Sequence, residues 1–237
     1  LAKSWEHSPD YLVWTFHLRK DIKFNNGMPL SADDVLFTFQ LIYDPKITCS
    51  GRDLLMVDGK PWKVDKVDTY TVRITLPTTY AVFLGRMASS DLGIICKAVC
   101  EPPYQAGTFN SFMGAEATPE QVVGTGPFML DRYVPGQRLY LKRNPFYWRK
   151  DAAGTQLPYL DRLTIEITPD QNTELLRLQS GQADLTQSEI RPDDYAVLKR
   201  EATAGKLRLV DAGLSFDADA FWFNLKVEAK AGDPRRA

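Results

Sequence analysis

Apolar residues repeat every two residues in some parts of this chain and about every three and a half in others. This change of period is the sequence feature that most limits the possible folds. From residue 11 to 18 apolar and polar residues alternate, which predicts a half-buried strand. Asn26-Gly27 predicts a turn. From Ser31 onwards the apolar residues, among them Val35 and Phe39, recur at helical spacing. The first part of the chain therefore combines strands with at least one helix.

Ser31 and Asp34 stand three residues apart, as in a capping box, and predict the start of this helix. Asp33 adds negative charge to the first turn, where the helix dipole favours it. Asp44-Pro45 predicts the end. A catalytic carboxylate pair is the alternative interpretation of Asp33 and Asp34, but capping already explains both residues.

The remainder of the first half is less regular. Residues 62–76 contain another alternating strand, with Val72 and Ile74 on one side, and residues 80–87 predict a short helix. From 89 to 123 the pattern dissolves into Gly, Pro, Ser and single aromatic residues. A stretch of this length is either a functional loop or holds short helices.

The second half of the chain alternates strand and helix. Residues 127–134 and 138–143 predict a hairpin joined through Pro135-Gly136. Further strands are predicted at 160–168 (Leu163, Ile165 and Ile167 inward), 183–186, 206–211 and 220–225. Helices are predicted at 171–180, ended by Gly181, and at 193–203, begun by Pro192. This order favours an α/β arrangement with some parallel pairing.

The charges are nearly balanced, with 29 Lys and Arg against 30 Asp and Glu. This argues against a nucleic-acid partner, which requires a basic surface. No stretch is long and apolar enough to cross a membrane. The chain begins at Leu1 rather than Met, so we expect a longer protein, and the missing signal peptide carries no information about location.

No constellation of residues predicts catalysis, a cofactor or a metal site. The two histidines, His7 and His17, fall in a polar turn and on a strand face. Neither a nucleophile elbow nor a zinc-binding helix motif is present. Gly124-Thr125-Gly126 is followed by Pro127 and no helix, which argues against a phosphate cradle. A pair of glycosidase carboxylates stays open, because acidic residues are plentiful.

The cysteines leave two alternatives open. An odd number of thiols, Cys49, Cys96 and Cys100, leaves at least one unpaired within the chain. The three residues are either small buried thiols or, in an exported protein, include a disulfide such as Cys96–Cys100. The five tryptophans could stack on sugar rings or peptide side chains, although Trp14 and Trp222 fall within predicted strands and are expected in the core.

Several segments together resemble the family 5 extracellular solute-binding proteins, which include dipeptide, oligopeptide and nickel binders. They are residues 1–6, 14–21, 23–27 and 31–35, then 123–128 (Val-Gly-Thr-Gly-Pro-Phe) and 143–148 (Arg-Asn-Pro-Phe-Tyr-Trp), then 157–162 and 178–184, and finally 223–225 and 233–237. The resemblance runs through nearly the whole chain in order.

This resemblance implies an α/β fold, a lobe like those of class II periplasmic binding proteins. Such a lobe has a mixed β-sheet with flanking helices, plus a smaller α+β subdomain. Residues 1–122 resemble the extra subdomain of lobe I, and 123–215 the main sheet of lobe I. Residues 216–237 resemble the crossover toward lobe II, which is absent here. One sheet edge is expected to lack its partner strand.

The resemblance also implies a non-enzymatic protein, monomeric at full length, that captures a small solute for an ABC permease. It would be periplasmic or lipid-anchored outside the cell and need no cofactor or metal. The solute is an oligopeptide or an oligosaccharide, because the insertion at 151–158 resembles a branch with both kinds of binder. The candidate ligand-binding residues, chosen by their placement in loops, are Ser89, Ser90, Asp91, Asn110, Phe112 and Thr125.

Two other functions remain as alternatives. A carbohydrate-active enzyme would need two acids facing one cleft at hydrolytic spacing. A sensor would present its lobe to a membrane receptor instead of a permease. For the leading hypothesis, we expect residues 1–237 alone to bind solute weakly or not at all, because half of the burying surface would be missing.

Overall fold

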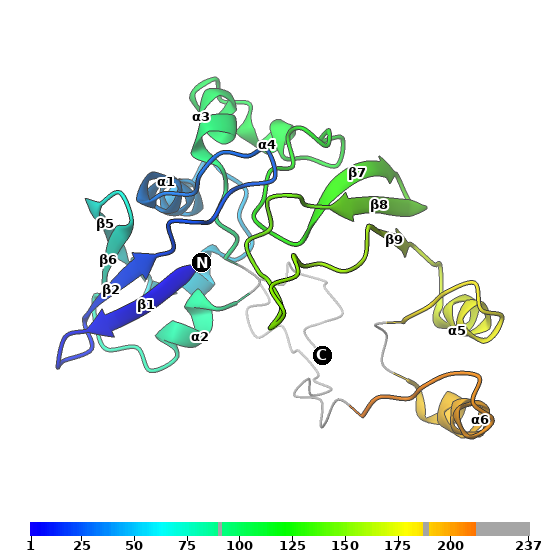
Figure 1. Cartoon of the computed structure of the whole chain (residues 1–237). Helices are drawn as coiled ribbons and strands as arrows, with labels where there is room; N and C mark the ends of the chain where they lie inside the picture. The colour runs from blue at the N-terminus through cyan, green and yellow to red at the C-terminus, as the bar shows by residue number, and fades with distance from the viewer. Residues whose placement is uncertain (90–91, 187–189, 212–237) are drawn as a thin grey trace, which may run out of the picture. The chain divides into compact units, whose positions relative to one another are not determined.

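The computed structural model describes residues 1–89, 92–186 and 190–211 (Figure 1). The chain divides into two compact units, Leu1–Ile167 and Thr168–Ala237. The strand predicted at 220–225 and the crossover at 216–237 lie outside the described residues. So do the candidate ligand-binding residues Ser90 and Asp91.

The first unit opens with a four-stranded antiparallel sheet of order β1-β2-β6-β5. Its strands are β1 (Ala2–His7), β2 (Val13–Leu18), β5 (Lys63–Asp68) and β6 (Thr71–Thr75). The alternation predicted for β2 is confirmed, because Trp14, Phe16 and Leu18 are buried. Neither β1 nor β5 follows from the hydrophobic pattern, since most residues of both edge strands are exposed.

Helix α1 (Ala32–Tyr43) confirms the predicted cap. The backbone N–H of Ser31 donates to Asp34 Oδ2 (2.8 Å), and Asp33 N donates to Ser31 Oγ (3.2 Å). The second oxygen of Asp34, Oδ1, accepts from the backbone N–H of Lys97 (2.9 Å), the first residue of α3 (Lys97–Gln105). One buried carboxylate therefore stabilises the N-termini of two helices.

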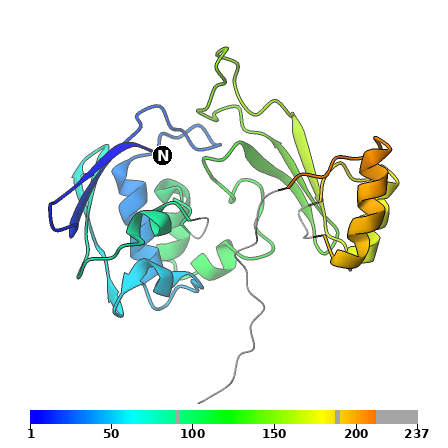
Figure 2. The same cartoon turned by 90° about the horizontal axis from the view of Figure 1, so that it is seen from below.

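The main hydrophobic core lies between this sheet and α1. Apolar residues of α1, including Val35 and Phe39, share one buried cluster with Trp14 and Ile74 of the sheet. Figure 2 shows α1 alongside the sheet. Phe83, at the start of the short helix α2 (Phe83–Met87), is fully buried in the same cluster and completes its aromatic centre.

The irregular stretch at 89–123 holds short helices, one of the two predicted alternatives. Besides α3 it contains α4 (Phe109–Phe112), and side chains of both pack against α1 in a second buried cluster around Phe37 and Leu41. A 3-10 helix, η1 (Arg52–Leu55), and a small hairpin, β3 (Met56–Val57) and β4 (Lys60–Pro61), follow α1.

A second, three-stranded antiparallel sheet of order β7-β8-β9 completes the first unit. β7 (Phe128–Val134) and β8 (Arg138–Arg143) form the predicted hairpin, and Gly136 in its turn has φ of +68°. β9 (Arg162–Glu166) was expected to point Leu163, Ile165 and Ile167 inward. Their exposed fractions are instead 37%, 39% and 44%, because β9 is an edge strand of a small sheet.

The second unit contains α5 (Gln171–Gln179) and α6 (Pro192–Thr203), both as predicted. Asp170 caps α5 through Asn172 N and Thr173 N. The strands predicted at 183–186 and 206–211 are wrong for this structure, because neither segment joins a ladder in the described part, and Leu185 is 80% exposed. All ladders among the described residues are antiparallel, so the expected parallel pairing is not found there.

All three cysteines are free thiols, and Cys96 and Cys100 are buried. Of the two alternatives that the sequence left open, the structure therefore has small buried or half-buried thiols. Among the described residues, no helix combines the length and the hydropathy of a membrane span.

Candidate functional site

The loop that carries Thr125 is held on one flank by Asn25. The backbone N–H of Asn25 donates to the carbonyl of Gly124 (2.9 Å), and its side-chain amide donates to the carbonyl of Val122 (3.2 Å). Asn25 is buried in the turn that follows β2, 97 residues earlier in the chain. A buried amide with satisfied donors fixes both segments relative to one another.

Asn144 holds the other flank of the same loop and is completely buried. Its side-chain amide donates to the carbonyl of Gly126 (2.8 Å), and its backbone N–H donates to the carbonyl of Pro127 (2.9 Å). Its Oδ1 accepts from Phe146 N (2.9 Å). Thr125 thus stands half-buried at the centre of a loop whose backbone is fixed from two sides.

A hollow of about 390 Å³ opens beside this loop. It lies between the apolar side of the β7-β8 hairpin and the segment from 114 to 124. Residues that line it are Asn25, Gly124, Leu130, Tyr133, Leu139 and Leu141. The loop that carries Thr125 therefore borders a hollow whose walls are mainly apolar and whose lining includes the Asn25 amide.

A larger hollow of about 660 Å³ lies between the four-stranded sheet and α2. Its lining is almost entirely apolar and includes Trp5, Phe16, Leu84, Met87 and Leu92. The candidate residue Ser89 also lines it and is half-buried. A mainly apolar cavity with few polar groups is typical of small-molecule sites.

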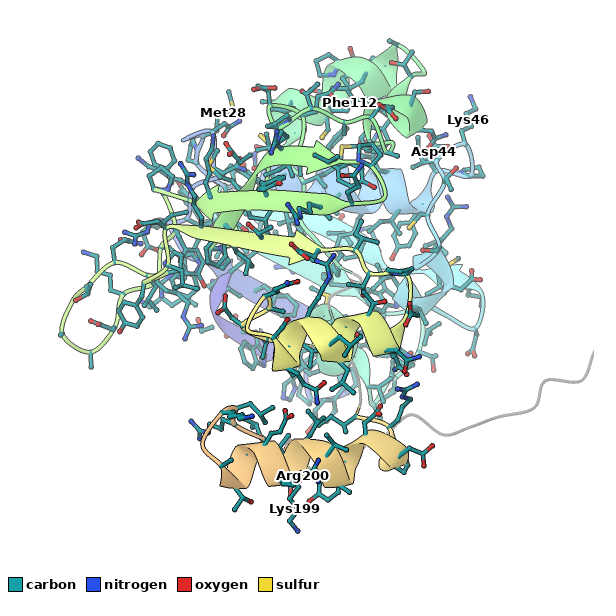
Figure 3. All side chains as sticks on the ribbon, turned by 90° about the vertical axis from the view of Figure 1, so that its right-hand side faces the viewer. Met28, Asp44, Lys46, Phe112, Lys199 and Arg200 are labelled. Atoms are coloured by element: carbon teal, nitrogen blue, oxygen red, sulfur yellow. The ribbon has the colours of Figure 1, made fainter. Side chains whose placement is uncertain are left out.

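Asn110 and Phe112 are engaged within the fold itself. Thr48 N donates to Asn110 Oδ1 (3.0 Å), and Asn110 Nδ2 donates to the carbonyl of Lys46 (3.0 Å). Phe112 packs against the second buried cluster. Figure 3 labels Phe112 and, near the edge of the view, Asp44 and Lys46, which belong to the segment just after α1.

The structure therefore does not bring the predicted site residues to one place. Ser89 lines the larger hollow, and Gly124, the neighbour of Thr125, lines the smaller one, while Asn110 and Phe112 line neither. Whether these residues contact a ligand stays a prediction. The sequence pattern did not single out Asn25 and Asn144, for which an Asn beside a turn or before Pro was the available signal.

Many of the described carboxylates sit at turns and caps, and others form ion pairs on strands. Ser8 Oγ and Leu12 N donate to Asp10, Lys46 N and Tyr104 OH donate to Asp44, and these hydrogen bonds lower the pKa of both carboxyls. The pKa values of Asp21, Asp68, Glu120, Asp131, Asp151 and Asp170 are likewise lowered. A general acid would need the opposite shift.

The histidines and cysteines form no metal centre in the part of the chain that the structure describes, because no group of three or more His, Cys, Asp or Glu is close enough to share an ion there. His17 Nε2 lies 3.6 Å from Glu6 Oε1 on the exposed side of the first sheet. His7 stacks on Tyr11, with ring centroids 4.3 Å apart. Both imidazoles make surface contacts.

The family model described as "Bacterial extracellular solute-binding proteins, family 5 Middle" matches residues 1–235. A "Probable ABC transporter-binding protein" of Deinococcus radiodurans is 30% identical, over 97% of this chain and 40% of that protein. "Heme-binding protein A" of Haemophilus influenzae is 34% identical, over 89% and 38%. The "Periplasmic alpha-galactoside-binding protein" of Rhizobium meliloti is 28% identical, over 99% and 34%.

Solved structures show the same relationship. A periplasmic binding protein of Helicobacter pylori, in complex with the peptide STSA, superposes with a TM-score of 0.67 at 28% identity, covering 84% of this chain and 39% of that one. The chain spans about 40% or less of the length of each of these relatives. The expected fold class is confirmed, since these neighbours are periplasmic binding proteins built from mixed sheets and helices.

Proposed function

Because the chain belongs to the bacterial extracellular solute-binding proteins of family 5, we propose that it is part of the substrate-binding component of an ABC importer. The captured solute is an oligopeptide or a similar small molecule outside the cytoplasmic membrane. The single observation that carries this proposal is the family match over residues 1–235, which includes all the described strands and helices.

The two hollows support a binding role. Both are predominantly apolar. The smaller hollow has the Asn25 amide in its lining, and the larger has Ser89. Apolar cavities with few polar groups are typical of small-molecule sites. Hydrogen bonds and ion pairs lower the pKa of the carboxyls of Asp44, Asp131 and Asp170, which suits solvated structural roles rather than acid catalysis. We therefore propose a protein without enzymatic activity.

We also propose a division of the chain into three parts. Residues 1–122 would be the extra subdomain of lobe I, residues 123–215 its main sheet, and residues 216–237 would lead toward lobe II. The loop that carries Thr125 joins the first two parts, and the hydrogen bonds of Asn25 and Asn144 hold it. The partner is an ABC permease, and the complete protein is a monomer that is periplasmic or anchored outside the cell by a lipid.

An oligosaccharide is the second candidate solute. The relative whose name refers to alpha-galactosides aligns with 99% of this chain. The insertion at 151–158 forms an ordered loop, closed by a bridge between Lys150 and Gln156 and by a hydrogen bond from Tyr159 OH to Asp151 Oδ2 (2.7 Å). Such a loop offers polar groups and an exposed tyrosine to a sugar.

The test is a calorimetric titration of short peptides and of galactosides into residues 1–237 and into the same chain extended to the full length of its relatives. We expect saturable peptide binding by the long form and weak or no binding by the short form. Tight galactoside binding without peptide binding would favour the second candidate. Equally tight binding by both forms would contradict the assignment of this chain to one lobe of a clamp.

A matched pair of variants tests the proposed contacts in the long form. Ser89→Ala removes the hydroxyl beside the larger hollow, whereas Ser111→Ala changes an exposed residue of α4 that lines neither hollow. If Ser89 contacts the solute, its removal weakens binding by about 0.5–1.5 kcal/mol and the control leaves it unchanged. Equal affinities would remove Ser89 from the site. Turnover of a glycan panel would overturn the non-enzymatic assignment.

A further inference from the structure

Two sulfur atoms from distant parts of the chain lie in contact at the surface of the first unit. Cys96 Sγ donates to Met28 Sδ at 3.9 Å. The Cys96 side chain is 1% exposed, whereas Met28 is 44% exposed and Figure 3 shows it at the edge of the molecule. An exposed thioether is therefore in direct contact with a buried thiol.

The backbone of the turn fixes Met28 in this position. Phe24 N donates to the Met28 carbonyl (2.8 Å), and Met28 N donates to Asn26 Oδ1 (3.1 Å). Gly27 has φ of +85°, and a Cβ built there would lie 3.3 Å from the Phe146 ring. A turn with these constraints holds the Met28 side chain against Cys96.

The two sulfur atoms differ in their chemistry. Thiols react with oxidants and alkylating agents as thiolates, and burial, followed by the nearby Asp34 carboxylate, raises the pKa of Cys96. A thioether needs no deprotonation to accept an oxygen atom. Of the two, the exposed Met28 is the one that an oxidant from solvent reaches first.

We propose that Met28 is a modification site for two-electron oxidants such as hydrogen peroxide, and that its unoxidised side chain shields the Cys96 thiol. One peroxide oxygen is transferred to Met28 Sδ, the O–O bond breaks, the sulfur is oxidised by two electrons to the sulfoxide, and water leaves. The polar sulfoxide no longer packs on the thiol as an apolar cover. This inference rests on the sulfur contact and is independent of the solute that the protein binds.

The test exposes the 237-residue chain to hydrogen peroxide and follows each methionine by peptide mass mapping. Met113, which is 40% exposed at the end of α4, is the internal reference. We expect Met28 to gain one oxygen at a rate similar to that of Met113, with Cys96 unmodified during that time. A Met28 that stays unoxidised while Met113 is converted would overturn the proposal.

A second measurement follows alkylation of Cys96 by iodoacetamide before and after oxidation. We expect oxidation of the wild-type chain to accelerate this reaction on the order of tenfold, through easier local opening, and methionine sulfoxide reductases to reverse the effect. Met28→Leu keeps an apolar cover of similar volume, so peroxide leaves its Cys96 as slow as before, whereas Met113→Leu behaves like wild type. Equal alkylation of Cys96 in oxidised and untreated wild type would overturn the shielding role.

Discussion

The two larger sheets of the first unit follow the same alternation of apolar and polar residues but differ in how deeply their apolar residues are buried. In the four-stranded sheet, Trp14, Phe16 and Ile74 are at most 7% exposed. In the three-stranded sheet, Leu163 and Ile165 of β9 are more than a third exposed. Strand β2 of the first sheet and strand β9 of the second each place their apolar residues on one face.

This difference shows that alternation and burial have separate causes. Alternation decides which side chains share a face, because successive residues of a strand point to opposite sides. Burial needs a second layer. Helix α1 supplies that layer to the first sheet, with its cap at Asp34 tied to α3. The second sheet has the loop segment from 114 to 124 over part of β7 and β8, and a hollow of about 390 Å³ remains between them.

The largest expected effect tests whether the first sheet carries the stability of the unit. Phe39→Ala removes a ring that is 2% exposed and that neighbours Tyr43 and Trp62. We expect it to lower the free energy of unfolding by about 3–5 kcal/mol, the usual cost of emptying a core aromatic site. Urea denaturation measures the loss.

The matched change in the second sheet is Ile165→Ala. The Ile165 side chain is already 39% exposed, so we expect a loss of about 1 kcal/mol or less. Similar losses for the two variants would break the comparison, because they would show that β9 is as well covered as the first sheet.

An intermediate effect tests the anchoring of the covering helix. Asp34→Asn replaces the carboxylate that accepts from Ser31 N and Lys97 N, and we expect a loss of about 1.5–3 kcal/mol. Asp33→Asn removes a surface ion pair with Lys66 and one negative charge from the first turn of α1, and should cost about 0–1 kcal/mol. Urea denaturation of both variants checks this. If the two variants lose the same free energy of unfolding, the cap that α1 and α3 share at Asp34 does not hold α1 on the first sheet.

The smallest effect compares one tyrosine from each region. Burial raises the pKa of Tyr43 to about 12, whereas a hydrogen bond from Arg138, followed by the charges of Arg138 and Arg132, lowers the pKa of Tyr140. In a titration followed by phenolate absorbance, Tyr43→Phe should remove the last phenol to ionise and Tyr140→Phe an early one. The reverse order would contradict the assigned environments.

The Tyr43 shift has a consequence for stability. A phenol whose folded pKa lies above its unfolded value of about 10 contributes stability that is complete below pH 10. That contribution is lost as the pH rises toward about 12. The burial of Cys100, whose pKa is raised to about 11, acts in the same direction. Denaturation at several alkaline pH values should show a shallower decline in Tyr43→Phe than in wild type.

The sequence predicted those elements whose signals are local. Strand β2 and helix α1 followed from periodicity and from the capping box at Ser31. Helices α5 and α6 followed from Gly181 and Pro192. Strands β1 and β5 did not, because an edge strand with exposed residues carries no hydrophobic pattern, and its existence depends on the neighbour with which it pairs.

The candidate site was less predictable for the same physical reason. A residue such as Asn110, expected in a loop and found in the short helix α4, is equally polar whether it faces a ligand or, as here, donates to Lys46 and accepts from Thr48. The side-chain amides of Asn25 and Asn144 donate hydrogen bonds to the loop around Thr125, and Asn25 lies 97 residues from its acceptor, Val122. Such roles depend on which segments meet.

The sequence by itself determined the family, the alternating faces and the helix ends, because these depend on motifs and hydrogen bonds within a few residues. Only the tertiary structure decided which apolar face is covered, that Asp34 serves two helices, and that Met28 lies over Cys96. These are contacts between residues more than 60 positions apart, and their geometry follows from the packing of whole elements rather than from any local pattern.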